Sequence, residues 1–583
     1  MKTTTLSASL ALALAGSTAR ADEPTPADSA QPPITAEPAQ PSAEPEIHPV
    51  IPETLDPHQA ELVEHLKELK DSPATPVDPL KPLQGAHGAD APKRERRDPT
   101  WDTWGDLRGR VVGGTDPALD DLGTPSGRHV WGSSRLIAGA DWKQGEHTTV
   151  ELELEALNGM FAGDRTSVGT VLGDDTLKVR RADYRDMKVI LPRKLDVAYA
   201  AKWGSVRVGA QTFTWGTGML ANDGAGDPDF GDANTGSVVA RGALVLTPWR
   251  ASQKKVGAAR GLGFFVAGDL VLRDDNASLF EGDLAGAGVA GLRLQTPRVE
   301  LGALFVGRWQ RDRVDPNDPR PDRAITTAFP FDAYGRFVLT PAGANERVLL
   351  EGELATVHGH TNRSYLDATA ANGARVASLG ALVRLRYDND KLRVTAKVEV
   401  GFASGDNDSR DDVVRAFSFH TDTNAGMLLF DEVLPLMTAR SVDRAADPAL
   451  VDTPPPGARY TVNQGAISNA VYVNPVLRYR PLPDLDLRFG WLTAWSAGDF
   501  ADAYQTGVSG GYNVTAGGVS GGSHALGHEL DLGLRYTVHI PGATALTFGA
   551  EGASFLPGAA FDGVGGDRLG TQWLGRGRAS FTW

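Results

Sequence analysis

Segments of about ten residues, in which apolar and polar side chains alternate, follow one another from residue 101 to the C-terminus. In 392–402, apolar residues take every even position, whereas Arg393, Thr395, Lys397 and Glu399 take odd ones. Because successive side chains of a strand point to opposite faces, each segment has one apolar and one charged face. A soluble β-sandwich also alternates, but it seldom carries so many charges on so many strands. The pattern therefore predicts an all-β chain that forms a transmembrane antiparallel β-barrel.

The composition excludes several other classes of protein. No apolar run reaches the roughly 18 residues that a membrane helix needs, so any membrane crossing has to be made by strands. The chain has no Cys, which excludes a disulfide framework and a cysteine-ligated metal site. A net charge of −15 argues against nucleic acid as a partner, because nucleic-acid binders neutralise phosphates with clustered Lys and Arg. All 12 Trp follow residue 100, as interfacial aromatic girdles require.

The alternation predicts about 18 strands, with short connections on one side and longer ones on the other. Outer-membrane barrels combine short periplasmic turns with longer extracellular loops, so we expect 158–193, 216–236, 405–466 and 498–526 outside the cell. The segment 177–190 is ambiguous, because one additional strand there would break the parity. The expected strands are 101–113, 130–142, 146–157, 194–202, 205–215, 237–247, 261–273, 284–294, 298–310, 329–340, 346–357, 374–387, 391–404, 467–480, 485–497, 527–539, 544–556 and 571–583.

The last segment ends the chain on an aromatic residue. Trp583, Phe581 and Ala579 share one face, and Arg578 and Arg576 share the other. Such a strand resembles the C-terminal signal that outer-membrane barrels present to their assembly machinery. That machinery and outer-membrane lipid are therefore the expected partners. The alternative is an ordinary edge strand.

The N-terminus has the features of an export signal. Lys2 precedes an apolar core over 6–15 and an A-x-A cleavage site at 19–21, which predicts a signal peptide over 1–21. This indicates export to the envelope of a Gram-negative bacterium.

The composition changes near residue 100. The first 100 residues hold 16 of the 37 Pro and no Phe, Tyr or Trp, so 22–100 is expected to be a periplasmic linker without a core. One short helix is expected near 56–70, either solvated or docked on a partner. The barrel is expected to occupy 101–583 of the chain, in the outer membrane.

The charged positions of the strands are expected to line the lumen. Two strands joined by the short turn 388–390 are expected to set Arg386 near Arg393 and Arg384 near Lys397, as a basic ladder that favours anions. The alternative is that neighbouring carboxylates neutralise the ladder, which then only braces the wall. The predicted lumen-lining residues are Glu151, Glu153, Glu155, Glu351, Glu353, Arg384, Arg386, Arg393, Lys397, Glu399, Arg478, Arg488, Glu529, Asp531 and Arg535.

No catalytic residue is expected. The segment 286–291 matches GxGxxG, but no helix follows to receive a pyrophosphate. His528 opens no zinc-binding HExxH, since Leu532 stands where the second His belongs. His358 and His360 begin an outer loop and lack the Ser and acidic partners of a hydrolase. We therefore expect a protein that is not an enzyme.

Two acidic loops are candidates for Ca²⁺, which takes six to eight oxygen ligands. Asp406, Asp408, Asp411 and Asp412 form one of them, and the carboxylates of 223–232 form the other. Neither loop completes an EF-hand, and the alternative is a solvated loop. No other cofactor is expected.

Three stretches resemble motifs of the alginate-export family of outer-membrane barrels. GFASGD at 401–406, LGHELDL at 526–532 and FLPG at 555–558 are similar to GxASGD, LGxELDL and FFPGD, although Ala559 replaces the expected Asp. QTFTWG at 211–216 is a fainter match. The resemblance covers mainly the last third of the chain and implies an 18-stranded passive channel. The family's polysaccharide exporters have a strongly basic lumen, whereas the charges here are mixed.

The expected function is that of a passive outer-membrane channel, of porin or export type, in which fixed charges select a small solute or a polysaccharide. The alternative is a structural or adhesive barrel with a plugged lumen. The sequence leaves open whether a loop folds into the pore.

Overall fold

The computed structural model describes most of the chain after residue 98. The predicted signal peptide, the helix near 56–70 and nearly all of the linker lie outside the described residues. These are 99–583 except 170–183, 185–186, 234–235, 250–260, 315–322, 342–344, 364–372, 453–457, 542–543 and 564–568.

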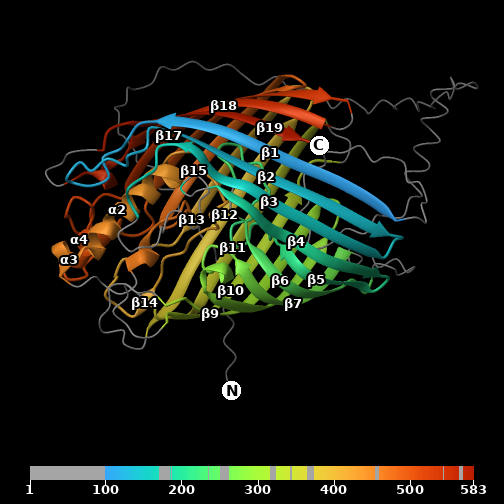
Figure 1. Cartoon of the computed structure of the whole chain (residues 1–583), viewed down its shortest axis with the longest axis horizontal. Coiled ribbons are helices and arrows are strands. Elements are labelled where there is room, and N and C mark those ends of the chain that lie inside the picture. The colour runs from blue at the N-terminus through green and yellow to red at the C-terminus, as the bar shows by residue number, and fades with distance from the viewer. Residues whose placement is uncertain are drawn as a thin grey trace, which may run out of the picture. The chain divides into compact units, whose positions relative to one another are not determined.

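The described chain forms one sheet of 19 strands, of which all but the two-residue β14 are long (Figure 1). This leaves the 18 long strands that the alternation predicts, although several ends differ by a few residues. The long strands are β1 (Thr100–Gly114), β2 (Val130–Gln144), β3 (Thr148–Gly163), β4 (Lys188–Ala201), β5 (Gly204–Thr212), β6 (Val238–Leu246), β7 (Leu262–Arg273), β8 (Leu284–Gln295), β9 (Val299–Arg311), β10 (Ile325–Val338), β11 (Glu346–Thr361), β12 (Ala374–Asn389), β13 (Val394–Ala403), β15 (Ala470–Leu482), β16 (Leu485–Trp495), β17 (Ala525–Ile540), β18 (Thr544–Pro557) and β19 (Gln572–Thr582).

The sheet closes into a barrel because its first and last strands pair. β1 lies antiparallel to β19, with Gly109 opposite Ala579, and its other edge pairs with β2. Trp583 extends this closure, since its backbone exchanges two hydrogen bonds of 3.1 Å with Gly105. Closure leaves no unpaired edge, which a bilayer could not satisfy. The C-terminal strand is thus the closing strand, and the alternative of an ordinary edge strand is wrong.

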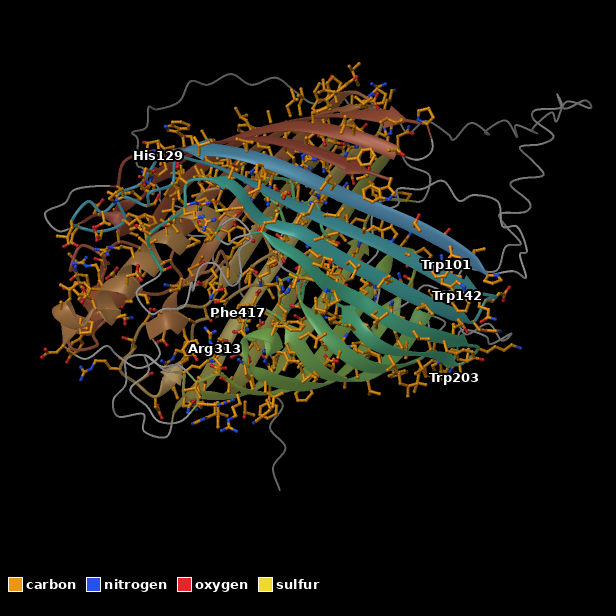
Figure 2. All side chains as sticks on the ribbon, viewed as in Figure 1. Trp101, His129, Trp142, Trp203, Arg313 and Phe417 are labelled. Carbon is orange, nitrogen blue, oxygen red and sulfur yellow. The ribbon has the colours of Figure 1, made fainter. Side chains whose placement is uncertain are left out.

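Large apolar side chains cover the outer face of the barrel. On β19, Phe581 is 37% exposed whereas the alternating Arg578 is only 8% exposed. Trp101, Trp142 and Trp203 gather at one end of the strands (Figure 2). An apolar outer band with interfacial aromatic residues is the surface that lipid covers. The chain is an outer-membrane β-barrel.

Short and long connections alternate around the barrel, as predicted. The short turns lie at the end where β1 begins and β19 finishes, and the long connections lie at the other end. The connection between β6 and β7 (247–261) is a longer exception at the short-turn end, as the sequence predicts for 248–260. Outer-membrane barrels keep their short turns on the periplasmic side. The long connections discussed below are L1 (115–129), L2 (164–187), L3 (213–237), L7 (404–469) and L8 (496–524).

L7 and L8 contain helices that the alternation did not predict. L7 forms η4 (Leu429–Val433), a π-helix, then α2 (Leu434–Ala446) and α3 (Pro448–Val451). L8 forms α4 (Ala503–Val508), which lies beside α2 at the loop end of the barrel (Figure 1). The short β14 (Val413–Val414) is parallel to β12. Among the described residues, no helix has both the length and the apolar composition needed to cross a bilayer.

The turn between β12 and β13 is displaced from its expected place. β12 continues to Asn389, whose side chain accepts a hydrogen bond from the backbone N–H of Leu392 (2.9 Å). The turn therefore occupies 390–393, with Arg393 in the left-handed region at φ 56°. Arg393 donates to the carbonyl oxygen of Pro481 (2.9 Å). Its expected place in the lumen is wrong, because Arg393 belongs to a periplasmic turn.

Candidate functional site

The charged face of the sheet points into the barrel. All predicted lumen-lining residues except Arg393 lie on this inner face, and most of them are buried. These residues are Glu151, Glu153 and Glu155 on β3; Glu351 and Glu353 on β11; Arg384 and Arg386 on β12; Lys397 and Glu399 on β13; Arg478 on β15; Arg488 on β16; and Glu529, Asp531 and Arg535 on β17.

The glutamates of β3 are neutralised by arginines of the next strands. Arg193, which is completely buried, places Nε 2.6 Å from Glu153 and a terminal nitrogen 3.3 Å from Glu155. Arg207 contacts Glu151 at 2.6 Å. Removing one member of such a buried pair leaves an uncompensated charge, which is strongly destabilising. We interpret these pairs as braces of the wall.

The predicted basic ladder has a different register from the expected one. Arg386 lies opposite Lys397, and Arg384 lies opposite Glu399. The expected pairs of Arg386 with Arg393 and of Arg384 with Lys397 are wrong. The cause is the longer strand β12, which displaces the turn and shifts every pair.

Carboxylates neutralise this ladder, as the alternative interpretation expected. Arg384 donates to Glu399 through Nε and a terminal nitrogen (2.8 and 2.6 Å) and lies 3.5 Å from Glu351. Arg386 contacts Asp388 at 2.9 Å and keeps 42% of its side chain exposed. Of Arg384 and Arg386, only Arg386 therefore has substantial contact with solvent in the lumen.

L3 folds into the barrel and sets carboxylates against basic residues of the inner face. These basic residues, which we call the basic wall, come from neighbouring strands between β13 and β1. Strand carboxylates, among them Asp106, Asp486 and Glu551, lie between these cations. The basic wall consists of Arg108, Arg110, Lys397, Arg478, Arg488, Arg535, Arg576 and Arg578.

Asp232 is the most enclosed of the L3 carboxylates that meet the basic wall. Its side chain is 2% exposed, and four arginines surround it: Arg110 at 2.9 Å, Arg576 and Arg578 at 3.1 Å, and Arg108 at 3.6 Å. These arginines project from β1 and β19, the pair that closes the barrel. Asp232 therefore anchors L3 at the closing seam.

Asp229 anchors L3 farther along the basic wall. Its carboxylate lies 2.5 Å from Lys397 and 3.6 Å from Arg478, and its backbone carbonyl accepts a hydrogen bond from Arg488 (2.8 Å). The cations that meet the acidic stretch 223–232 are thus guanidinium and ammonium groups. The described contacts therefore do not support a calcium site in this stretch.

Asp227 is the most exposed of the three carboxylates. Its side chain is 50% exposed, compared with 18% and 2% for the other two. Arg535 contacts it at 2.6 Å, Arg578 at 3.6 Å and Arg488 at 3.9 Å. A solvated charge contact therefore lies inside the barrel.

The start of L3 is held by the opposite wall. Trp215 donates its indole N–H to Asp332 on β10 (2.8 Å). Glu353 on β11 accepts hydrogen bonds from both the backbone N–H and the hydroxyl (2.6 Å) of Thr217. L3 thus bridges two walls of the barrel.

L7 also folds inward, and Glu529 anchors it. Glu529 accepts backbone N–H groups from Met427, Leu428 and Leu429, the latter two at 2.8 Å, where η4 begins. The first N–H groups of a helix have no intrahelical acceptor, so a carboxylate there is stabilising. Neighbouring Asp531 accepts no hydrogen bond from any described donor.

Apolar side chains of L7 pack on the inner face. Phe430 meets Tyr472 of β15 edge-on, with ring centroids 5.9 Å apart. The Tyr472 ring covers Gly401, where a Cβ atom would lie 2.0 Å from it. Phe417 and Phe419 belong to the same buried cluster. Gly401, part of the GFASGD motif, thus makes room for this packing.

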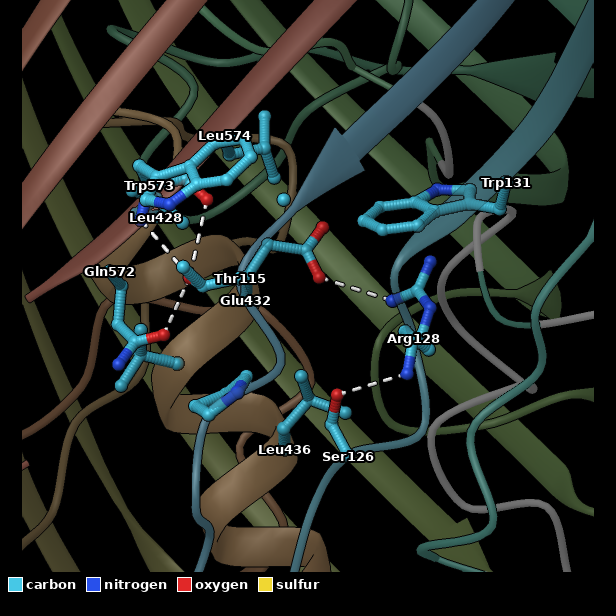
Figure 3. Close-up of a pocket in the computed structure, with 13 residues that line it drawn as sticks. Thr115, Ser126, Arg128, Trp131, Leu428, Glu432, Leu436, Gln572, Trp573 and Leu574 are labelled. Atoms are coloured by element: carbon cyan, nitrogen blue, oxygen red, sulfur yellow. Dashed lines mark hydrogen bonds and ion pairs between the residues drawn. The ribbon is translucent and has the colours of Figure 1, made fainter. Parts of the chain in front are cut away.

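Arg128 of L1 ties L7 to the rim of the barrel (Figure 3). Its guanidinium lies between the rings of Trp131 (3.7 Å) and Tyr184 (4.1 Å) and contacts Glu432 at 3.1 Å. Tyr184 donates its hydroxyl to the same carboxylate (2.6 Å). The adjoining cavity of about 20 Å³ has room for one water molecule.

The other predicted calcium loop makes local contacts. Asp411 pairs with Arg415 at 2.6 Å, and Asp406 accepts the backbone N–H of Arg415. Asp408 accepts a backbone N–H, and Asp412 is exposed. Within the described ranges, no three His, Asp or Glu side chains converge as a metal site would require.

The motif-like stretches occupy ordinary structural positions. Residues 286–291 lie within β8. His358 and His360 are exposed on β11, and His528 of β17 is exposed and hydrogen-bonded to Thr493 (3.0 Å).

Sequence reasoning missed part of the basic wall. Arg108 and Arg110 share one face of 101–113, as Arg576 and Arg578 share one face of 571–583. The alternation of apolar and polar residues is enough to predict all four arginines on the inner face of the barrel. Their counter-ions on L3 had no comparable signal, because a loop's path through a lumen has no periodicity.

Comparisons with known proteins find similar structures only at low sequence identity and low TM-score. No known family profile matches the chain, and no curated protein does. The chain is similar to the solved structures of Pseudomonas aeruginosa OpdQ and OpdL, each with TM-score 0.43, 11% identity, and 83% of this chain and 98% of that chain covered. It is also similar to OprD from the same organism, with TM-score 0.42, 11% identity and coverage of 83% and 95%. The comparisons do not support the resemblance to the alginate-export family, which remains a prediction from the motifs.

Proposed function

We propose that the chain is a passive outer-membrane channel whose lumen is narrowed by L3 and L7. The observation that carries this proposal is the half-exposed carboxylate of Asp227 among buried arginines. Water reaches this contact inside the barrel, and fixed charges beside a water path are what give a passive channel its selectivity. A barrel with a purely structural role has no need of such a contact.

The charge balance at this contact favours anions. The eight cations of the basic wall pair with seven carboxylates of the strands and L3, so the cations outnumber their printed counter-ions by one. The seven carboxylates are Asp106, Asp227, Asp229, Asp232, Glu399, Asp486 and Glu551.

The inward loops favour a small solute over a polymer. L3 is hydrogen-bonded to one wall and ion-paired to the other, and L7 packs apolar side chains on the inner face. A polysaccharide, which the resemblance to alginate exporters implies, would require both loops to leave the lumen. The small-solute channel requires no such rearrangement.

The test is single-channel recording of the purified protein in planar bilayers. We expect discrete openings whose conductance rises with salt concentration and whose reversal potential in a salt gradient indicates mild anion preference. Silence at all voltages and salt concentrations refutes the channel.

The apolar packing of L7 favours a second candidate, a plugged barrel with a structural or adhesive role. Deleting 427–446, with a glycine linker in its place, distinguishes the two. A plug predicts a silent full-length protein and a conducting deletion variant, whereas the channel predicts openings in both.

A further inference from the structure

Each of the two inward loops is attached to the wall by one member of a pair of buried carboxyl groups. In the L7 pair, Glu529 accepts the backbone N–H groups of L7 and is hydrogen-bonded to the side chain of Asp531. In the L3 pair, Glu353 accepts the N–H and the hydroxyl of Thr217 and is hydrogen-bonded to the side chain of Asp332. All four acidic residues are at most 3% exposed. The same arrangement therefore occurs at both attachments.

We propose that each pair shares one proton, and that this proton makes the attachment of L7 and L3 to the wall tighter as the pH falls. An ionised carboxylate only accepts hydrogen bonds, so two carboxyl groups can be hydrogen-bonded to each other only if one of them is protonated. Two ionised carboxylates in contact would also repel each other. The inference adds regulation by pH to the proposed channel, and only its effect on the current rests on that channel.

Within the described ranges, no cation takes the place of this proton in the L7 pair. The charged groups that face Asp531 from other elements are themselves carboxylates, Asp431 of η4 and Glu551 of β18, and Glu551 is already paired with Arg535 at 2.9 Å. Neither oxygen of Asp531 accepts a hydrogen bond from a described donor, whereas Glu529 accepts three backbone N–H groups. Asp531 is therefore the member that carries the proton and donates it to Glu529.

The L3 pair also lacks a cation among the described residues. Trp215, which is neutral, donates to one oxygen of Asp332, and Glu353 is the one charged group of the described chain that acts on Asp332. Apolar residues of the neighbouring strands lie opposite the pair, Leu304 on β9 and Leu382 on β12. The remaining oxygens, Asp332 Oδ2 and Glu353 Oε1, have no described donor. One proton between these two oxygens satisfies both of them.

Detachment of a loop releases the shared proton. In the attached state each pair holds one proton at neutral pH. When the loop leaves and water reaches both groups, they behave as ordinary carboxyl groups, which lose their protons above about pH 4. The attachment therefore has its full stability below this pH and weakens by up to about tenfold per pH unit above it. A lower pH holds L7 and L3 against the wall, and a higher pH frees them.

The test is hydrogen–deuterium exchange of the full chain in detergent from about pH 5 to about pH 8, corrected for the intrinsic rate. Protection of the amides of 427–429, which Glu529 holds, and of Thr217, which Glu353 holds, should fall by up to about tenfold per pH unit as the pH rises. The amides of α2, which L1 holds through Arg440, are the internal control and should not follow this dependence. Protection of 427–429 and Thr217 that does not change with pH refutes the shared proton.

Two variants replace the protonated carboxyl group by an amide of the same shape, and each is the control for the other. Asp531→Asn donates an N–H to Glu529 and does not titrate, so L7 should keep its low-pH protection at every pH while L3 still loses its own. Asp332→Asn, whose amide oxygen can still accept from Trp215, should do the reverse. The inference is refuted if 427–429 keep their pH dependence in Asp531→Asn, or lose their protection at every pH in a variant with normal heat-modifiable mobility.

Two further measurements separate this inference from the channel itself. The infrared band of protonated carboxyl groups at neutral pH should weaken in each variant, and an unchanged band refutes the shared proton. In planar bilayers, the fluctuations of the open-channel current should increase with pH in the unchanged protein and stay constant in the double variant with Asp332→Asn and Asp531→Asn. Silent bilayers with pH-dependent exchange refute the channel alone. Normal openings with pH-independent exchange refute the shared proton alone.

Discussion

At the scale of single residues, Glu529 connects a sequence motif to a loop position. Glu529 of the LGHELDL stretch was predicted to line the lumen, and it accepts hydrogen bonds from three consecutive backbone N–H groups of L7. Charge-assisted hydrogen bonds are about twice as strong as neutral ones, so Glu529 makes a large contribution to holding L7 in place. Glu529 of this motif therefore has a structural role, anchoring L7, whichever family the chain belongs to.

Replacing Glu529 by Leu should loosen L7. Three buried N–H groups would lose their acceptor, at a cost of about 3 kcal/mol for the local fold of the loop. We expect faster cleavage of L7 by protease added to vesicles and larger fluctuations of the open-channel current. Glu346→Leu, at the exposed start of β11, is the control and should change neither quantity. Equal protection of L7 in both variants contradicts the anchoring role.

Arg386 and Arg393 should behave differently, although the alternation assigned both to the lumen. Arg386→Gln removes a half-solvated lumen charge and should shift the reversal potential in a salt gradient toward cations. Arg393→Gln changes only a periplasmic turn and should leave the reversal potential unaltered. Heat-modifiable mobility confirms folding of each variant. Equal shifts contradict the register in which Arg386 faces Lys397.

At the scale of elements, the strands were predictable from the sequence and the loops were not. Alternation is local, so 571–583 alone is enough to assign the faces of β19. The helix α2 depends on contacts with L1 and L2, 320 and 274 residues away, and with L8, 63 residues away. The sequence of α2 has no period of two. The turn after β12 was misplaced for a related reason. Asp388 and Asn389 are common turn residues, but here the pairing with β11 and β13 keeps them in the strand.

The contact between L1 and α2 should resist acid. Asp120 accepts Arg440 Nε at 2.7 Å and hydrogen bonds from Thr124. Burial raises the pKa of Asp120, but the Thr124 hydrogen bonds and Arg440 outweigh it and hold the pKa below its ordinary value. A lowered carboxylate pKa contributes stability that is present above the ordinary value and lost as the pH falls through the folded one.

Hydrogen–deuterium exchange of 434–446, corrected for the intrinsic rate, should therefore stay constant from pH 7 to about 4.5 and increase only in stronger acid. Asp120→Asn should exchange faster at every pH in this range. An increase of exchange near pH 6 in the unchanged protein would instead point to a histidine.

At the scale of the whole barrel, L3 joins walls of opposite charge. Asp332 and Glu353 hold its beginning, and the basic wall holds its end through Asp232. L3 thus meets one wall with neutral hydrogen-bond donors and the other with carboxylates that pair with its cations. This organisation requires L3 to enter from the extracellular end, and so it depends on the orientation of the barrel.

The orientation predicts which sites antibodies can reach on intact cells. Epitope tags at Gly510 in L8 and at Asp452 after α3 should be labelled, because both lie in long connections and no atom lies within 4 Å of the Cβ direction of Gly510. A periplasmic tag belongs at Lys391, in the turn after β12, and not at Asn389, which is only 7% exposed and bonded within the strand. Lys391 should be labelled only after the outer membrane is opened. Labelling of Lys391 on intact cells, in a variant with normal heat-modifiable mobility, would invert the barrel and place L3 at the periplasmic entrance.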